Sequence, residues 1–239
     1  MIHRVTGDVP RQMHPSQVVA GHLDTPGIPL LRGWSHAIAI LPAAVGMTVL
    51  LLSARADSGQ RASVAIYGSA LVLLFTVSTL YHRGPWSPRV RAVWRRVDRA
   101  NIFLMIAATY TAVAVNLLSG ATRTGILVAI WVTAGLGMIM VAGPLRVPRP
   151  LLVLAYVATG WMAIVIMPAL AARVGAGGLA FLLAGGGLYS LGALAYGLRR
   201  PRLWPRVFSY HEVFHLLVIA ATAVFFAFIA LAVMPAARA

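Results

Sequence analysis

Long apolar stretches separated by short polar turns make up most of the chain. Seven stretches each reach the roughly 20 apolar residues that a helix needs to cross a bilayer core. They lie at about 34–54, 62–82, 99–119, 124–143, 150–171, 175–198 and 211–235. We therefore predict an all-α integral membrane protein in which residues 33–236 form one seven-helix bundle after a tail at residues 1–32.

The composition agrees with this pattern and excludes some chemistry. Of the 239 residues, 60% are hydrophobic, and the mean hydropathy of +0.83 is well above that of a soluble domain. Cysteine is absent, which excludes disulfides, thiolate metal ligands and a cysteine nucleophile. Residues 1–32 contain no apolar run typical of a signal peptide, so we expect the first membrane helix to be retained.

The net charge is +15, and all twenty basic residues are arginine. Fifteen of them fall in the tail or beside the connections that follow the second, fourth and sixth predicted helices, and five fall on the other side. Because cytoplasmic loops are enriched in basic residues, we predict a cytoplasmic N-terminus, an outside C-terminus and a multi-pass protein of the plasma (inner) membrane. The same rule accounts for the basic pI, so we expect membrane lipids and no nucleic acid as partners.

Three histidines are predicted at one depth of this bundle. His82 ends the second helix, while His211 and His215 begin the seventh, which starts on the same side of the membrane. Residues four apart on a helix project from one face, so His211 and His215 can both reach one ion. Three imidazoles suit zinc, with a fourth position left for water.

Two more polar residues are predicted close to the histidines. Asp98 precedes the third helix, where it could cap that helix, act as a general base or hold a ligand histidine. Ser78 lies one turn before His82 and could bond a ligand group or its own backbone. Just before Asp98, the arginine-rich stretch Pro88–Arg96 is predicted to lie at the membrane interface.

The segment His211–His215 also matches H-E-x-x-H, the zinc metalloprotease signature, in which Glu212 would be the general base. That interpretation leaves His82 and Ser78 without a role. His36, at the start of the first helix, could approach the site but belongs to no motif.

These residues together resemble the haemolysin III family, the bacterial branch of the progestin and adipoQ receptors. The matching segments read S-T-L-Y-H from Ser78, I-F-L-M-I-A-A-T-Y-T from Ile102 and H-E-V-F-H-L-L-V from His211. The resemblance covers essentially residues 30–235. The family often has His where this chain has Arg99, a position outside the proposed ligand set.

The resemblance implies Zn²⁺ held by His82, His211 and His215 near the cytoplasmic face, with Asp98 and Ser78 as candidate catalytic residues beside it. It also implies hydrolysis of a lipid amide, as in alkaline ceramidases, so the expected function is a zinc-dependent intramembrane hydrolase of ceramide-like amide or ester bonds. Three alternatives stay open: a receptor or homeostasis protein with structural or regulatory zinc, a metalloprotease using Glu212, and the cytolytic activity that the family name implies.

Overall fold

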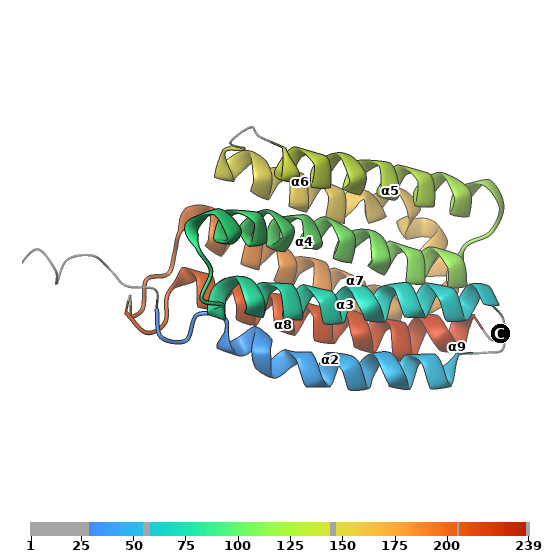
Figure 1. Cartoon of the computed structure of the whole chain (residues 1–239). Helices are drawn as coiled ribbons and strands as arrows, with labels where there is room; N and C mark the ends of the chain where they lie inside the picture. The colour runs from blue at the N-terminus through green and yellow to red at the C-terminus, as the bar shows by residue number, and fades with distance from the viewer. Residues whose placement is uncertain (1–28, 55–57, 144–146, 205, 238–239) are drawn as a thin grey trace, which may run out of the picture.

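The computed structural model describes residues 29–54, 58–143, 147–204 and 206–237, so nearly all of the predicted tail lies outside the described residues. Within these ranges the regular elements are all helical (Figure 1). They are α2 (Trp34–Ser53), α3 (Ser58–Arg83), α4 (Pro88–Leu117), α5 (Gly120–Ala142), α6 (Arg149–Trp161), the 3₁₀ turn η1 (Met162–Ile166), α7 (Met167–Leu198), α8 (Tyr210–Phe228), the π turn η2 (Ile229–Val233) and α9 (Met234–Ala236). The predicted all-α class is confirmed.

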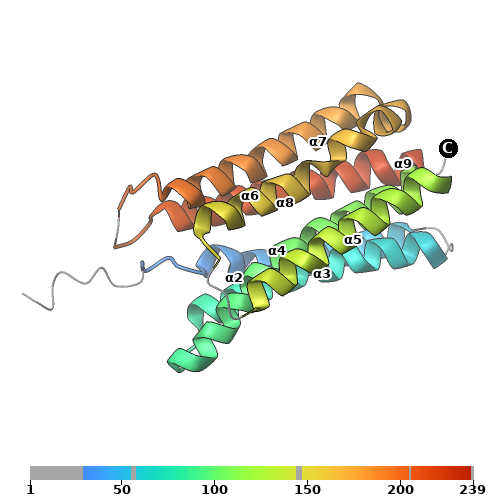
Figure 2. The ribbon, with the colours of Figure 1, turned by 90° about the horizontal axis from the view of Figure 1, so that it is seen from above.

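Six helical stretches among the described residues are long and apolar enough to cross a membrane. One of them, Arg149–Leu198, is 50 residues long and is broken at Gly175, whose φ of 62° and ψ of −171° are not helical. A straight helix of that length would measure about 75 Å, more than twice a bilayer core. Instead, α6 and the later part of α7 run side by side in opposite directions (Figure 2). The predicted seven spans count these two arms separately, and that number stays a prediction.

Close helix packing holds the bundle together. The largest fully buried side chains include Tyr67, Phe103 and Phe228, which come from three different helices. Two glycines allow aromatic rings to approach the backbone: a Cβ on Gly137 would lie 2.5 Å from the ring of Phe103, and one on Gly185 would lie 2.7 Å from that of Phe225. Small residues at such contacts are typical of membrane helix interfaces, where van der Waals packing drives association.

The start of α4 differs from the sequence prediction. The helix begins at Pro88 and not near residue 99, with Ser87 as its N-cap accepting a 3.5 Å hydrogen bond from the backbone N–H of Val90. Proline is favoured in the first turn because its missing N–H would be unpaired there anyway. Asp98 therefore lies inside α4, and the prediction that it caps a helix is wrong. The stretch Pro88–Arg96 forms the first turns of the same helix.

Several helix ends meet at one end of the bundle. There α2, α4 and α8 begin and α3 and α7 end, which brings together residues from the first and last parts of the described chain (Figure 1). We call this the histidine end, because the three predicted ligands lie on α3 and α8 near these termini.

Candidate metal centre

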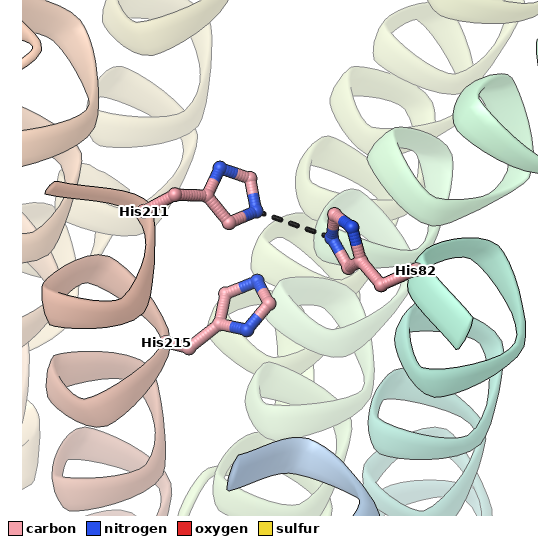
Figure 3. A group of neighbouring side chains, drawn as sticks. All are labelled: His82, His211 and His215. Atoms are coloured by element: carbon pink, nitrogen blue, oxygen red, sulfur yellow. Dashed lines mark hydrogen bonds between the residues drawn. The ribbon is translucent and has the colours of Figure 1, made fainter. Parts of the chain in front are cut away.

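His82, His211 and His215 come together at the histidine end, as their spacing predicts. One ring nitrogen from each lies within 4.8 Å of one from each of the others. Nε2 of His211 is 3.1 Å from Nε2 of His82, across the space between α8 and α3 (Figure 3). His211 and His215 reach this space from successive turns of α8, as Figure 3 also shows. The structure thus joins two helices through three imidazoles.

This arrangement fits a tetrahedral metal ion. Zn–N bonds of 2.0–2.1 Å at tetrahedral angles place ligand nitrogens roughly 3.4 Å apart, close to the His82–His211 separation. The remaining separations are at most 4.8 Å, so a bound ion would require side-chain rotation to shorten the longer ones to that distance. His215 is buried, and its Nδ1 has no hydrogen-bond partner among the described residues. An unpaired buried polar atom is costly, so three convergent imidazoles of this kind are suited to a bound ion.

A fourth histidine packs behind the three. His36 on α2 is 3% exposed, and its ring lies nearly parallel to that of His215, with centroids 3.8 Å apart. Its other flank contacts Phe75 at 5.1 Å between centroids. His36 stands outside the group whose nitrogens converge, so we assign it contact with a ligand and not ligation.

Glu212, between the two α8 histidines, is fully engaged elsewhere. One carboxylate oxygen accepts a hydrogen bond from Nε of Arg32, and the other accepts one from the backbone N–H of Ser209 at 2.8 Å. The Ser209 side chain in turn accepts from the Glu212 backbone, which completes a capping box at the start of α8. A buried carboxylate held by an arginine and a helix cap favours a structural role over that of a general base.

The segment before α2 is anchored across this cap. The backbone N–H groups of Leu30 and Leu31 donate to the carbonyls of Arg206 and Val207, at 3.1 and 3.3 Å. Together with the Arg32–Glu212 ion pair, these bonds fix the residues before α2 against the residues before α8. Residues that precede α2 and α8 are therefore held together next to the histidine end.

The structure places the two candidate catalytic residues beside the histidines. Ser78 is buried one turn before His82, and its hydroxyl lies within hydrogen-bonding reach of the Asp98 carboxylate. Asp98 and His211 line the same cavity. The carboxylate thus faces the space next to the triad from inside α4, although it was expected at the helix start.

The cavity extends from Asp98 and His211 deep into the bundle. It is lined by α3, α4, α6, η1, α7 and α8, and most of its lining residues are apolar or aromatic. Along α4 the lining runs from Arg95 to Val113, about 27 Å at the rise of an α-helix, and along α8 it runs from His211 to Phe225. An apolar space of that length matches the thickness of a bilayer core.

Two parts of this site could not be assigned from the sequence. The ion pair between Arg32 and Glu212 joins residues 180 positions apart, and no local pattern connects them. His36 carried one usable signal, since a histidine within an apolar span is costly unless it has a function or a partner.

Fold and site together define a multi-pass membrane protein with a three-histidine candidate metal centre at one end of its helices. The sequence pattern of the family described as Haemolysin-III related matches residues 28–226. The chain belongs to the haemolysin III family.

Individual relatives agree with this assignment. The chain is 31% identical over 205 residues to Hemolysin-3 of Bacillus cereus. The matched region covers 85% of this chain and 90% of that protein. It is 27% identical over 195 residues to the Hemolysin-3 homolog of Bacillus subtilis (strain 168), with 80% and 88% covered. A shorter match of 81 residues at 36% identity, with 32% and 34% covered, relates it to the human Monocyte to macrophage differentiation factor.

Proposed function

We propose that this protein is a zinc-dependent intramembrane hydrolase that cleaves an amide bond of a ceramide-like lipid, or a lipid ester, in the plasma membrane. The observation that carries the proposal is the cavity, because it connects an apolar space of bilayer length to Asp98 and to His211, one member of the histidine triad. An acyl chain fits such a space, and its carbonyl group would then lie at the histidine end. The excess of arginines near that end supports its location on the cytoplasmic side.

Each polar residue has a role in this proposal. His82, His211 and His215 would hold Zn²⁺, which when bound acts as a Lewis acid and provides an activated water near neutral pH. Asp98 would accept the proton of that water and pass it to the leaving amine or alcohol. Ser78 would orient the Asp98 carboxylate through the hydroxyl within its reach.

A structural or regulatory zinc is the second candidate, favoured by a different observation. α3 and α8 pack mainly against other helices, yet His82 and His211 bring them together at one point. An ion there would link the two helices and stabilise the bundle whether or not any reaction takes place.

Two variants separate these candidates. With hydrolysis as the function, Asp98→Asn keeps the zinc content and the melting temperature and lowers the hydrolysis rate by roughly 10²–10⁴-fold, as loss of a general base does. His82→Ala loses both zinc and activity. Elemental analysis, thermal unfolding in detergent and release of fatty acid from ceramide-like and ester lipids are the measurements.

The opposite result favours the structural candidate. Zinc-loaded protein would then hydrolyse neither lipid class, Asp98→Asn would behave as wild type, and His82→Ala would lose zinc and lower the melting temperature without any change in hydrolysis. Chelation followed by return of zinc controls for lipid hydrolysis by a contaminant, since it acts only on activity that depends on the metal.

A further inference from the structure

The histidine end of the cavity carries more positive than negative side chains. Arg95 and Arg99 both line it, together with a single carboxylate, that of Asp98. The other acidic side chain among the residues that the structure describes is Glu212, and Arg32 already pairs with it. The lining at this end therefore holds two guanidinium groups and one carboxylate, and a bound metal ion would add further positive charge.

One face of α4 changes from charged to apolar along the cavity. Arg95 and Arg99 lie four residues apart, and Ile102 and Ile106 continue the same face toward the interior. Such a face matches an amphiphile, with guanidinium groups at the polar end and aliphatic side chains along the tail. The Tyr156 hydroxyl on α6 donates a 2.8 Å hydrogen bond to the backbone carbonyl of Arg99, which ties α6 to α4 at this end.

A third arginine reinforces this end from outside the cavity wall. Arg149 lies over the ring of Tyr196, 4.8 Å from its centroid, and donates a 3.4 Å hydrogen bond to the carbonyl of that residue. Tyr196 itself lines the cavity. The cation is therefore held next to the polar end, where its field favours negative charge.

We infer that the cavity selects lipid amides whose polar part carries an anionic group, a carboxylate or a phosphate, a few bonds from the amide nitrogen. Arg95 and Arg99 contact this group by charge-assisted hydrogen bonds, while the acyl chain lies between α4, α6, α7 and α8. The inference rests on the proposed function in that it places a lipid amide in the cavity. It adds that the neutral head of a simple ceramide is the poorer ligand.

A matched pair of probes tests this selectivity. N-palmitoylglycine and N-palmitoylethanolamine share the chain and the amide but end in a carboxylate and a neutral hydroxyl group, respectively. Their dissociation constants are measured on the full-length protein in neutral detergent, with zinc and after chelation. We expect N-palmitoylglycine to bind about tenfold or more tightly in both conditions, as charge-assisted contacts predict.

Variants on α4 show whether the two arginines cause the preference. Arg95→Gln and Arg99→Gln should each weaken binding of N-palmitoylglycine and leave binding of N-palmitoylethanolamine unchanged. The dissociation constant of N-palmitoylethanolamine divided by that of N-palmitoylglycine should therefore fall in each variant. Arg96→Gln is the matched control, because Arg96 is exposed on the same helix and does not line the cavity. Binding of the neutral amide shows that each variant is folded, so the ratio within one variant stays interpretable.

Palmitate, with its carboxylate at the end of the chain, is a further probe. It shows whether the arginines recognise an anionic head group beyond the amide or simply the carboxylate of a fatty acid. Weaker binding of palmitate than of N-palmitoylglycine supports the inference. Three results overturn it: equal affinity for the two amides, an equal effect of Arg96→Gln and Arg99→Gln, or palmitate binding as tightly as N-palmitoylglycine with the same dependence on Arg99.

Failure of this inference differs from failure of the proposed function. Hydrolysis of neutral and anionic amides at equal efficiency would retain the hydrolase and overturn the head-group selectivity. A persistent binding preference without any turnover would retain the selectivity and remove the hydrolase.

Discussion

His36 lies flat against His215, with ring centroids 3.8 Å apart and planes inclined by 10°. His36 is buried between this ring and Phe75, so the His215 imidazole cannot swing toward α2. The contact fixes the direction in which a buried candidate ligand points. We therefore expect His36→Ala to weaken zinc binding about 10–100-fold, the usual effect of losing a group that orients a ligand.

A second substitution at this position distinguishes support from ligation. His36→Phe keeps a flat ring and removes both nitrogens, so it should bind zinc close to wild type if stacking is the role of His36. The cobalt-substituted protein would retain its visible spectrum in His36→Phe. Loss of zinc in both variants, with a changed cobalt spectrum in His36→Phe, would mean that His36 supplies a nitrogen to the metal.

Glu212 should contribute to stability and not to hydrolysis. Its carboxylate is buried against Arg32 and caps α8. Glu212→Gln can still cap the helix but leaves Arg32 without its partner, at a cost of about 1.5–3 kcal/mol. We expect a lower melting temperature in detergent with unchanged zinc content and hydrolysis per folded molecule.

The Arg32→Gln, Glu212→Gln and double variants complete this test as a double-mutant cycle. Because the two side chains contact each other, their effects on stability should be far from additive. Arg89→Gln, an exposed charge change on α4, serves as the control. Abolished hydrolysis in Glu212→Gln at normal stability would instead restore the metalloprotease interpretation.

The fold and the ligand triad were accessible from the sequence for separate reasons. Apolar stretches gave the helices, and the arginine count placed the ends carrying His82 and His211 on one side before any contact was known. The four-residue spacing then placed His215 beside His211. Helix ends were less accessible: Ser87 and Pro88 form the capping signal of α4, whereas the apolar pattern predicts a start near residue 99, and Asp98 therefore lies inside the helix and not at its start.

Contacts between distant segments explain what the sequence could not provide. The stacking of His36 on His215 and the ion pair of Glu212 depend on how α2 and the residues before it pack on α8. Neither helix shows this packing in its own periodicity. The cavity similarly results from the arrangement of six elements, and its charged end became apparent only when Arg95 and Arg99 were placed on its lining.

Gly33 should be required for the geometry of the histidine end. Its φ of 82° lies in the left-handed region, and a Cβ there would be 2.8 Å from Cβ of His82. Gly33→Ala therefore combines backbone strain of roughly 1–2 kcal/mol with a clash that pushes α2 away from α3. We expect a lower melting temperature together with weaker zinc binding, measured by thermal unfolding and zinc titration.

Gly135→Ala is the matched control for this substitution. A Cβ on Gly135 has open space around it, and the residue lies within α5, where alanine is the better helix former. The control should equal or slightly exceed wild type in stability and bind zinc normally. If Gly33→Ala also binds zinc normally, the approach of α2 to His82 is irrelevant to the metal centre.

The length of the cavity should set the length of the acyl chain. Gly186 lines the cavity about 15 Å along α7 from Tyr196, which lies at the histidine end. A Cβ at Gly186 would be 3.7 Å from the indole of Trp161, which also lines the cavity, so we expect a larger side chain there to take up part of this space. Gly186→Phe should weaken binding of palmitoyl amides about tenfold or more, because the end of the chain loses its apolar surroundings. Octanoyl amides should bind as before, since they end short of the block.

Gly187→Phe provides the control for this last prediction, because the neighbouring glycine has free space and does not line the cavity. It carries the same change in side-chain volume and helix propensity. Zinc content should stay at the wild-type level in both variants, since the histidines are at the other end. Equal loss of palmitoyl and octanoyl binding in Gly186→Phe, or equal effects of the two substitutions, would show that the acyl chain does not occupy this cavity.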